Sequence, residues 1–228
     1  MRRASEIITA QDRAAVAAAV AKAEGQTAAE IVPVVATASG RYDRAEDVAG
    51  VWLGVILMLV VWTIWPRNFD ASGSWGGAPL WTEAAALAAA VVIGFILGAL
   101  LCSRSARLTR LFAPRVQLRN DVLAGARHAF FDSRVHHAAS RSGVMIYVSL
   151  LEHEVVVLAD REVLAVIGQE KLNELCGQLK TDLASGRVAD ALCRAIQATG
   201  EKLAPLMPAA DSTPNELPDA LVILDRPL

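Results

Sequence analysis

The stretch RSGVMIYVSLLEHEVVVLADR, residues 141–161, consists of two apolar runs joined by a polar turn. Residues 143–150 and 155–159 are apolar at nearly every position, without the alternation that is typical of a strand with one wet face. The short connection at 151–154 suits an antiparallel hairpin. We therefore expect two neighbouring central strands with helices above and below them, which is the centre of an α/β domain.

A third strand is expected much earlier, in the β-branched run EIVPVVATA at residues 30–38. Pro33 has no N–H for a strand ladder, so this strand is predicted to lie at a sheet edge. Before it, Thr9 can cap a helix that runs to Ala23, with Asp12 at the third helical position and Gly25 as its end. One helix and one strand cannot bury a core, so they must join the strands of 141–161.

Three further helices are predicted to cover the sheet. One starts at Asn120-Asp121 and runs through Phe130-Phe131 on one face. The other two, at 169–183 and up to Ala204, carry apolar stripes at helical spacing. The stripe residues are Leu172, Leu175, Cys176, Leu179 and Leu183, then Val188, Leu192, Ala195, Ile196, Thr199 and Leu203. The predicted fold is an α/β domain with a mixed sheet and helices on both faces.

Two long uncharged runs interrupt this domain, Val48–Trp65 and Ala84–Cys102, of 18 and 19 residues. Each would span roughly 27–29 Å as a helix, about the hydrocarbon thickness of a bilayer. The alternative is a pair of buried core helices. The link between the runs is short and turn-rich, and tryptophans typical of a membrane interface gather near it, at Trp62, Trp65, Trp75 and Trp81. We predict an inserted transmembrane hairpin.

Arginines next to the runs set the expected orientation. Arg41 and Arg44 precede the first run and five arginines follow the second, whereas the loop between them has only Arg67. The positive-inside rule then predicts an integral membrane protein, of the inner membrane in a bacterium, with both termini and most of the chain in the cytoplasm. The five arginines, which are also expected to face anionic lipids, are Arg104, Arg107, Arg110, Arg115 and Arg119.

The chain is thus divided as follows: 1–47, the first helix and strand of the α/β domain; 48–66 and 80–102, the transmembrane helices; 67–79, an extracytoplasmic loop; 103–119, a basic juxtamembrane segment; and 120–228, the rest of the domain. Small residues give each transmembrane helix a packing face, at Gly50 and Gly54 and at Gly94 and Gly98. Packing of the hairpin on itself explains this face most simply, and contact with a partner or self-association of two copies is the alternative.

Catalytic motifs are absent from the sequence, which has no Gly-rich phosphate loop, no G-x-S-x-G and no helical pair of metal-ligating histidines. The three cysteines form no C-x-x-C pair and are interpreted as small buried hydrophobes. His136 and His137 are adjacent and diverge on a helix, and His153 falls at a hairpin tip. No feature favours a nucleic-acid partner.

Acidic and amide oxygens offer one candidate metal site. Asp160 ends a predicted central strand, where open α/β sheets present ligand-binding groups, or else caps the next helix. The loop DSTPNELPD adds oxygen donors of the kind that Ca²⁺ or Mg²⁺ binds, although its spacing is not that of an EF-hand and capping of a last short helix explains it equally well. The proposed ligands are Asp160, Asp211, Asn215, Glu216 and Asp219.

The hairpin RSGVMIYVSLLEHEVVVLAD, the two amphipathic helices after it, GEKLAPLMP and NELPD together resemble the TPM domain family of thylakoid lumen, photosystem-repair and receptor-modulating proteins. The closer resemblance is to bacterial membrane proteins of that family, in which EIVPVVA precedes a membrane hairpin. It covers residues 7–47 and 116–225. The resemblance implies a mixed sheet between helices, calcium binding in some members, weak acid phosphatase activity in plant ones, and binding of membrane complexes or receptors in others. Asp160 matches the aspartate that ends the family's third strand, and Asn215-Glu216 match its C-terminal signature; Glu162 stands where the family usually has glycine.

Together these features predict a membrane-anchored, cytoplasm-facing TPM-like domain that binds and stabilises a membrane protein complex without catalysing a reaction, with Ca²⁺ or Mg²⁺ as the candidate ion. The rival hypothesis is a weak metal-dependent phosphatase, in which Asp160 holds the metal and Arg161 the phosphate. The expected partners are the lipid bilayer and a membrane protein or complex.

Overall fold

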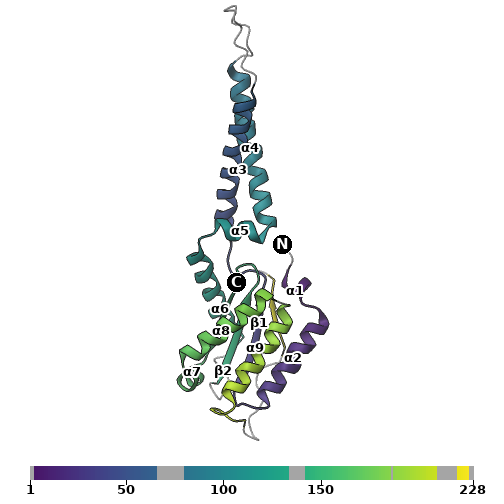
Figure 1. The fold of residues 1–228 in the computed structure, drawn as a ribbon, viewed down its shortest axis with the longest axis vertical. Helices are drawn as coiled ribbons and strands as arrows, with labels where there is room; N and C mark the ends of the chain where they lie inside the picture. Colours follow the sequence, from purple (N-terminus) through teal and green to yellow (C-terminus); the bar gives the residue numbers. More distant parts are fainter. Residues whose placement is uncertain (1–2, 66–79, 134–141, 186, 210–219, 226–228) are drawn as a thin grey trace, which may run out of the picture. The chain divides into compact units, whose positions relative to one another are not determined.

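The computed structural model describes residues 3–65, 80–133, 142–185, 187–209 and 220–225. Its sheet has four strands in the order β3-β2-β1-β4. Strand β1 (Glu30–Ala36) runs parallel to β2 (Gly143–Ser149) over its whole length and parallel to the short β4 (Val222–Leu224), while β3 (Glu154–Ala159) is antiparallel to β2. The mixed sheet of an α/β domain is therefore confirmed, and Figure 1 shows β1 and β2 side by side behind helices.

The order of the strands differs from the expectation at two places. Strand β1 lies inside the sheet, not at its edge, because β4 pairs with it on the side away from β2. Pro33 is tolerated because the ladder with β4 begins only at Val34, one residue later. The outer strands are instead β3 and β4, which are only partly buried, whereas every residue of β1 and β2 is buried. The tail expected to end in a short helix forms β4.

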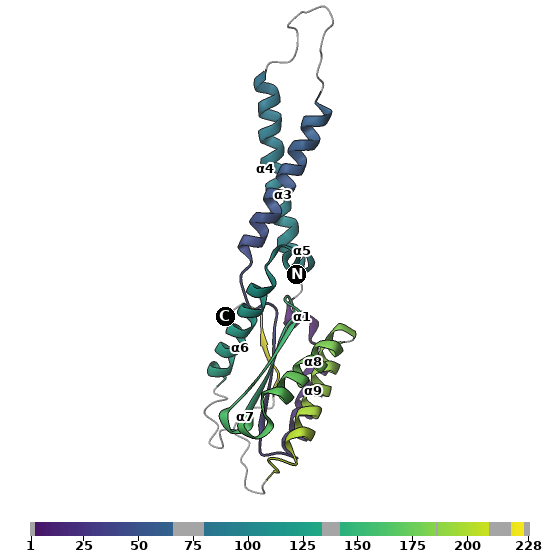
Figure 2. The ribbon, with the colours of Figure 1, turned by 60° about the vertical axis from the view of Figure 1, so that its left-hand side comes forward.

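Helices cover the two faces of this sheet. One face packs on α1 (Ala4–Ile7), α2 (Ala10–Glu24), α7 (Arg161–Ile167), α8 (Gln169–Ser185) and α9 (Val188–Leu203). The other face packs on α6 (Arg115–Asp132), whose Val122, Ala126 and Phe130 meet Val34 and Tyr147 of the strands. Figure 2 shows α6 on one side of the strands and α8 and α9 on the other. The prediction of helices on both faces is confirmed.

Local sequence explains where these helices begin and end. Thr9 and Asp12 form the capping box of α2, and Gly25 is its C-cap, as predicted. The stripes of α8 and α9 are also as predicted, with Leu172, Leu179 and Ile196 almost fully buried. Helix α6 begins five residues before Asn120, directly after Pro114, because no residue in 115–119 opposes a helix.

The chain separates into two compact units, one of residues Tyr42–Arg115 and one of Arg2–Arg41 with Val116–Leu228. The first unit contains two long apolar helices, α3 (Asp43–Ile64) and α4 (Leu80–Arg104), and the short α5 (Ala106–Phe112). The second unit contains the sheet. Because β1 precedes the apolar helices and β2 follows them, the sheet is assembled from segments that come before and after the first unit in the sequence.

Candidate functional site

The candidate metal ligands fall partly outside the described residues. Asp211, Asn215, Glu216 and Asp219 lie in the range 210–219, which the structure does not describe. In the described ranges, no three His, Cys, Asp or Glu side chains lie close enough together to hold a metal ion. The metal site therefore stays a prediction that rests on Asp160 and this loop.

Asp160 lies at the opposite end of the sheet from the one assumed. It ends the antiparallel strand β3, and its N–H donates to the carbonyl of Gly143, 2.8 Å away, where β2 begins. This is the edge at which the parallel strands start, not the carboxyl edge at which open α/β sheets bind ligands. Asp160 also occupies the N-cap position of α7, though no hydrogen bond from that helix to its side chain is found among the described residues.

The near end of the candidate loop lies at the same starting edge as Asp160. Pro208 bridges to Thr27, three residues before β1, and the N–H of Ala28 donates to the carbonyl of Met207 at 2.9 Å. On its far side the loop leads into β4, whose first residue, Val222, pairs with Val34, four residues into β1. Asp160 and the near end of the loop therefore share one edge of the sheet, whereas the far end enters the sheet part-way along β1.

A buried polar cluster that the sequence reading missed lies at the carboxyl edge of β1 and β2. We call Ser39, Tyr147, Ser149 and Glu152 the exit cluster, because Ser39 lies just after β1, where the chain leaves the sheet. Glu152, interpreted from sequence as part of a polar turn, is only 5% exposed. Its Oε1 accepts hydrogen bonds from the N–H groups of Ser39 at 2.8 Å and Gly40 at 3.3 Å.

The hydroxyl groups of the exit cluster form a chain with one direction. Ser149 donates to Oε2 of Glu152, and Ser39 Oγ donates to Ser149 Oγ at 2.8 Å. Because each serine has a single hydroxyl hydrogen, Tyr147 must donate to Ser39 across their 3.0 Å contact. The chain of hydroxyls thus ends on the carboxylate of Glu152, and every hydrogen in it has an acceptor.

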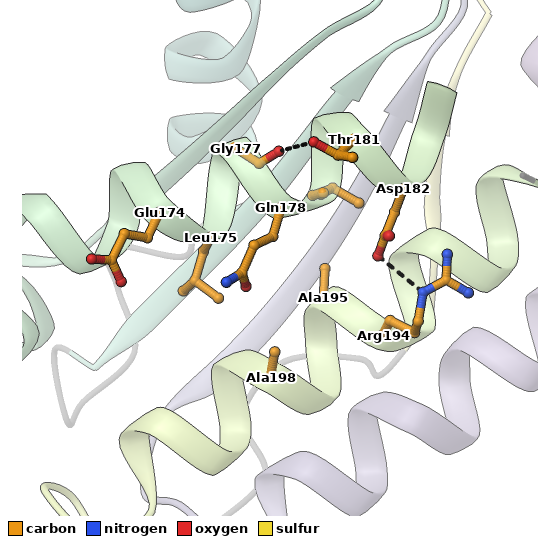
Figure 3. Close-up of a pocket in the computed structure, with 10 residues that line it drawn as sticks. Glu174, Leu175, Gly177, Gln178, Thr181, Asp182, Arg194, Ala195 and Ala198 are labelled. Carbon is orange, nitrogen blue, oxygen red and sulfur yellow. Dashed lines mark hydrogen bonds and ion pairs between the residues drawn. The ribbon is translucent and has the colours of Figure 1, made fainter. Parts of the chain in front are cut away.

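The sheet-containing unit has a groove of about 690 Å³ between α8 and α9. Its apolar lining comes from Leu175 and Leu179 of α8 and from Ala195 and Ala198 of α9. Figure 3 shows Leu175 and Gln178 facing Ala195 and Ala198 across it.

Ion pairs join α8 and α9 along this groove. Arg194 Nε lies 2.9 Å from Asp182, and Lys202 Nζ lies 3.5 Å from Glu174. The hydroxyl of Thr181 donates to the carbonyl of Gly177 in its own helix at 3.0 Å. The charged groups along the groove are therefore engaged in structural contacts, and the arrangement suits binding of an apolar ridge between charged borders.

The cysteines of α8 and α9 offer little reactivity. Cys176 and Cys193 are free and partly buried, and burial raises the pKa of both thiols. A raised pKa lowers the fraction of reactive thiolate at neutral pH. Cys102 is buried in the first unit, where Thr109 Oγ1 donates to its carbonyl at 3.1 Å.

The two apolar helices pack through the four glycines singled out from sequence. A Cβ on Gly94 would lie 2.5 Å from the Cα of Gly54, and one on Gly98 would lie 2.7 Å from the carbonyl oxygen of Ala49. A Cβ on Gly50 would be 2.8 Å from Phe95. The backbones can approach this closely because no side chain intervenes. The glycine face is therefore used inside the hairpin of α3 and α4.

Both helices are long and apolar enough to cross a membrane. Only 17% of the most apolar stretch of α3 and 22% of that of α4 is buried by the rest of the chain. Large apolar side chains such as Trp52, Ile56 and Ile93 are half exposed or more. After α4, Arg104, Arg107, Arg115 and Arg119 are exposed and Arg110 is partly buried.

Comparison with known proteins gives one structural likeness. No protein-family profile matches the chain, and no curated protein matches it. The chain is similar in structure to the BA42 protein from the psychrophilic bacterium Bizionia argentinensis, solved by NMR, with a TM-score of 0.56 and 15% identity over 97% of this chain and 99% of that one. At this identity the likeness concerns the fold alone.

Proposed function

We propose that this chain is a membrane-anchored binding protein, whose TPM-like α/β unit faces the cytoplasm and holds or stabilises a membrane protein complex. The observation that carries the proposal is the pair of exposed apolar helices inserted between two neighbouring strands of one sheet. An apolar surface of this extent on a soluble protein would be a strong aggregation liability. In a bilayer it is the anchor.

The low burial of α3 and α4 supports the anchor over the alternative of core helices in a soluble protein. Core helices have most of their apolar side chains covered, whereas these helices cover each other only along their glycine face. The exposed arginines that follow α4 support an orientation with that end in the cytoplasm, next to anionic lipid. Resistance to alkaline carbonate extraction tests the anchor, and labelling of cysteines placed at each terminus in sealed vesicles tests the orientation.

A binding role is supported by what the α8–α9 groove contains. Its floor is apolar, and the acidic and basic side chains beside it form ion pairs with one another. The resemblance to TPM domains, some of which bind membrane complexes or receptors, points to the same role.

The groove can be tested as the contact surface with two matched variants on α9. Ala198→Arg places a long charged side chain among the apolar lining, while Gln197→Arg adds the same residue one position away, at an exposed site outside the lining. The full-length protein would be cross-linked in its native membrane and its partners identified by mass spectrometry. We expect a specific partner with the unchanged protein and with Gln197→Arg, and its loss with Ala198→Arg. Equal recovery of that partner from all three excludes the groove.

A divalent cation is the second part of the proposal. Asp160 and the near end of the loop that carries Asp211, Asn215, Glu216 and Asp219 lie at one sheet edge, which supports a shared Ca²⁺ or Mg²⁺ site. Calorimetric titration of each ion into the full-length protein would be compared with Asp160→Ala and, as a control, Glu162→Gln. Saturable binding that only Asp160→Ala abolishes supports the site and makes an assay for phosphatase turnover worthwhile. Absence of binding to the folded protein removes the ion and with it the metal-dependent phosphatase.

A further inference from the structure

The carboxyl edge of the parallel strands is closed by the protein's own side chains. In open α/β sheets this edge is where ligands bind, close to the point at which neighbouring strands lead away in different directions. Here β1 has β2 on one side and β4 on the other, and the exit cluster lies where β1 and β2 end. Ser39, Ser149 and Glu152 are all at most 6% exposed, so the edge holds a dry, built polar site.

Glu152 sits in this site as a bound anion would. One carboxylate oxygen accepts from two consecutive backbone N–H groups, those of Ser39 and Gly40, and the other accepts from the hydroxyl of Ser149. Successive N–H groups that converge on one oxygen form the concave arrangement that binds anions in many proteins. The anion is supplied from a turn that is 113 residues away in sequence from Ser39.

Helix α6 closes the site from its other side. A Cβ on Gly125 would lie 2.9 Å from the hydroxyl of Tyr147 and 3.3 Å from the Cβ of Ser39. A Cβ on Gly40 would lie 2.5 Å from the carboxylate of Asp121. The segment Ser39–Gly40 is therefore held between α6 and the turn that carries Glu152. Only Arg41 separates this segment from the first residue of the unit that contains the apolar helices, Tyr42.

We infer that Glu152 is a built-in anionic ligand whose contacts with Ser39 and Gly40 latch the chain at the point where it leaves the sheet. The latch keeps the segment before Arg41 ordered by the α/β unit itself. Without the carboxylate, two backbone N–H groups and one hydroxyl would be left buried without acceptors, so the segment would open to water.

The test is site-specific proteolysis of the full-length protein in lipid nanodiscs. Arg41 is exposed, so trypsin cleavage after it, followed by mass spectrometry, reports how often the neighbouring Ser39–Gly40 segment opens. We expect Glu152→Ala to accelerate this cleavage by about tenfold or more, the factor that corresponds to loss of a buried acceptor. Glu154→Ala, which removes a carboxylate paired at the surface with Lys180, is the matched control and should leave the rate unchanged.

Acetate distinguishes an anionic ligand from simple packing. The Ala variant lacks only the CH₂–COO⁻ end of Glu152, and acetate has the size and charge to fill that space. Acetate at 0.1–0.3 M, on the order of a weak anion's dissociation constant, should slow cleavage again in Glu152→Ala, while chloride at equal ionic strength should not. Acceleration that acetate does not reverse would overturn the proposal, as would unchanged cleavage or equal acceleration in Glu154→Ala.

A second variant keeps the test valid where Glu152→Ala does not fold. Glu152→Gln has the same size and retains one acceptor for the two N–H groups, but it replaces the acceptor for Ser149 with a donor. We expect an intermediate cleavage rate and higher protection from amide hydrogen exchange at Ser39 and Gly40 than in any folded Ala variant. A Gln variant indistinguishable from the unchanged protein would show that charge is not required and would overturn the inference.

Discussion

Tyr147 and Glu152 illustrate at the residue scale how a buried polar group is kept satisfied. The phenol of Tyr147 is 1% exposed and begins a chain of donors that passes through two serines to the carboxylate. An amide or a neutral acid in place of the carboxylate would reverse this chain. The last hydrogen would then be that of the Tyr147 hydroxyl, whose oxygen lies 2.9 Å from the position that a Cβ on Gly125 would occupy.

Alkaline pH should destabilise the protein through Tyr147. Burial raises the pKa of this phenol above its usual value of 10.0, and the nearby charge of Glu152 adds to the rise. Above pH 10 the unfolded chain loses the proton while the folded protein keeps it, so stability is full below pH 10 and falls as pH rises toward the folded pKa. In Tyr147→Phe we expect a loss of about 1 kcal/mol at neutral pH and a smaller further loss between pH 9 and 11. Thermal unfolding in nanodiscs measures both; equal alkaline losses in the two proteins would contradict the assignment to Tyr147.

Single residues were predictable from sequence where their role depends on near neighbours. Thr9, Asp12 and Gly25 act within one helix, and the structure shows the capping box and the end they imply. Glu152 was missed because its burial depends on Ser39, 113 residues earlier. In a turn after Leu151 and before His153, a glutamate has the pattern of a solvated residue. The sequence signal for a buried polar partner was limited to Tyr147 and Ser149, the polar residues of an otherwise apolar strand.

Replacing a helical glycine by alanine should have opposite effects on stability at a packed position and at an open one. Gly200 of α9 packs on α2, and a Cβ there would lie 2.8 Å from that of Ala23, while a Cβ on Gly177 of α8 would meet open space. Gly200→Ala should therefore destabilise the protein by about 1–3 kcal/mol through overpacking. Gly177→Ala should stabilise it by about 0.5–1 kcal/mol through helix propensity. Thermal unfolding of the pair checks the signs, and a shift in the same direction for both would refute the close α2–α9 contact.

The apolar hairpin should depend on Gly94 in the same way. Gly94→Ala would bring a methyl group within 2.5 Å of the Cα of Gly54, so α3 and α4 must separate. We expect the free energy of unfolding to fall by about 1–3 kcal/mol, seen as a lower thermal midpoint in nanodiscs. We also expect the less compact hairpin to migrate more slowly in SDS gels. Ala88→Val, which adds two carbons at an exposed position of α4, is the control. Identical behaviour of the two variants would mean that the helices do not pack along this face.

Elements were predicted well in kind and less well in position. Runs such as EIVPVVA and GVMIYVS are strands because they are short, β-branched and buried on both faces. Their order could not be read from local rules. Pro33 indicates an edge in isolation, but the edge rule concerns one hydrogen bond, and β4 pairs only with the residues after it. The three residues of β4 are too few for the sequence pattern to predict a strand.

At the scale of the whole molecule, the sheet-containing unit should fold without the apolar helices. Its core is drawn entirely from residues before and after them, and Gly40 already lies against Asp121 of α6. A ten-residue Gly/Ser linker, with a span of about 16–19 Å, can join 41 to 116, since 116 is about 7.5 Å along α6 from Asp121. We expect a soluble monomer with a single cooperative unfolding transition. Recovery only as aggregates, or without near-ultraviolet circular dichroism, would show that the helices are needed for folding.

The position of the hairpin within the sheet also sets an order of events during synthesis. Strand β1 leaves the ribosome long before either of its neighbours, because both β2 and β4 are encoded after the apolar helices. At about 5–20 residues per second, the 113 residues between Ser39 and Glu152 take roughly 6–23 s to be made. During that interval α3 and α4 are made, while β1 has neither of its partner strands. The sheet can form only after both apolar helices have been made, so a completed α/β unit implies that translation has already passed them.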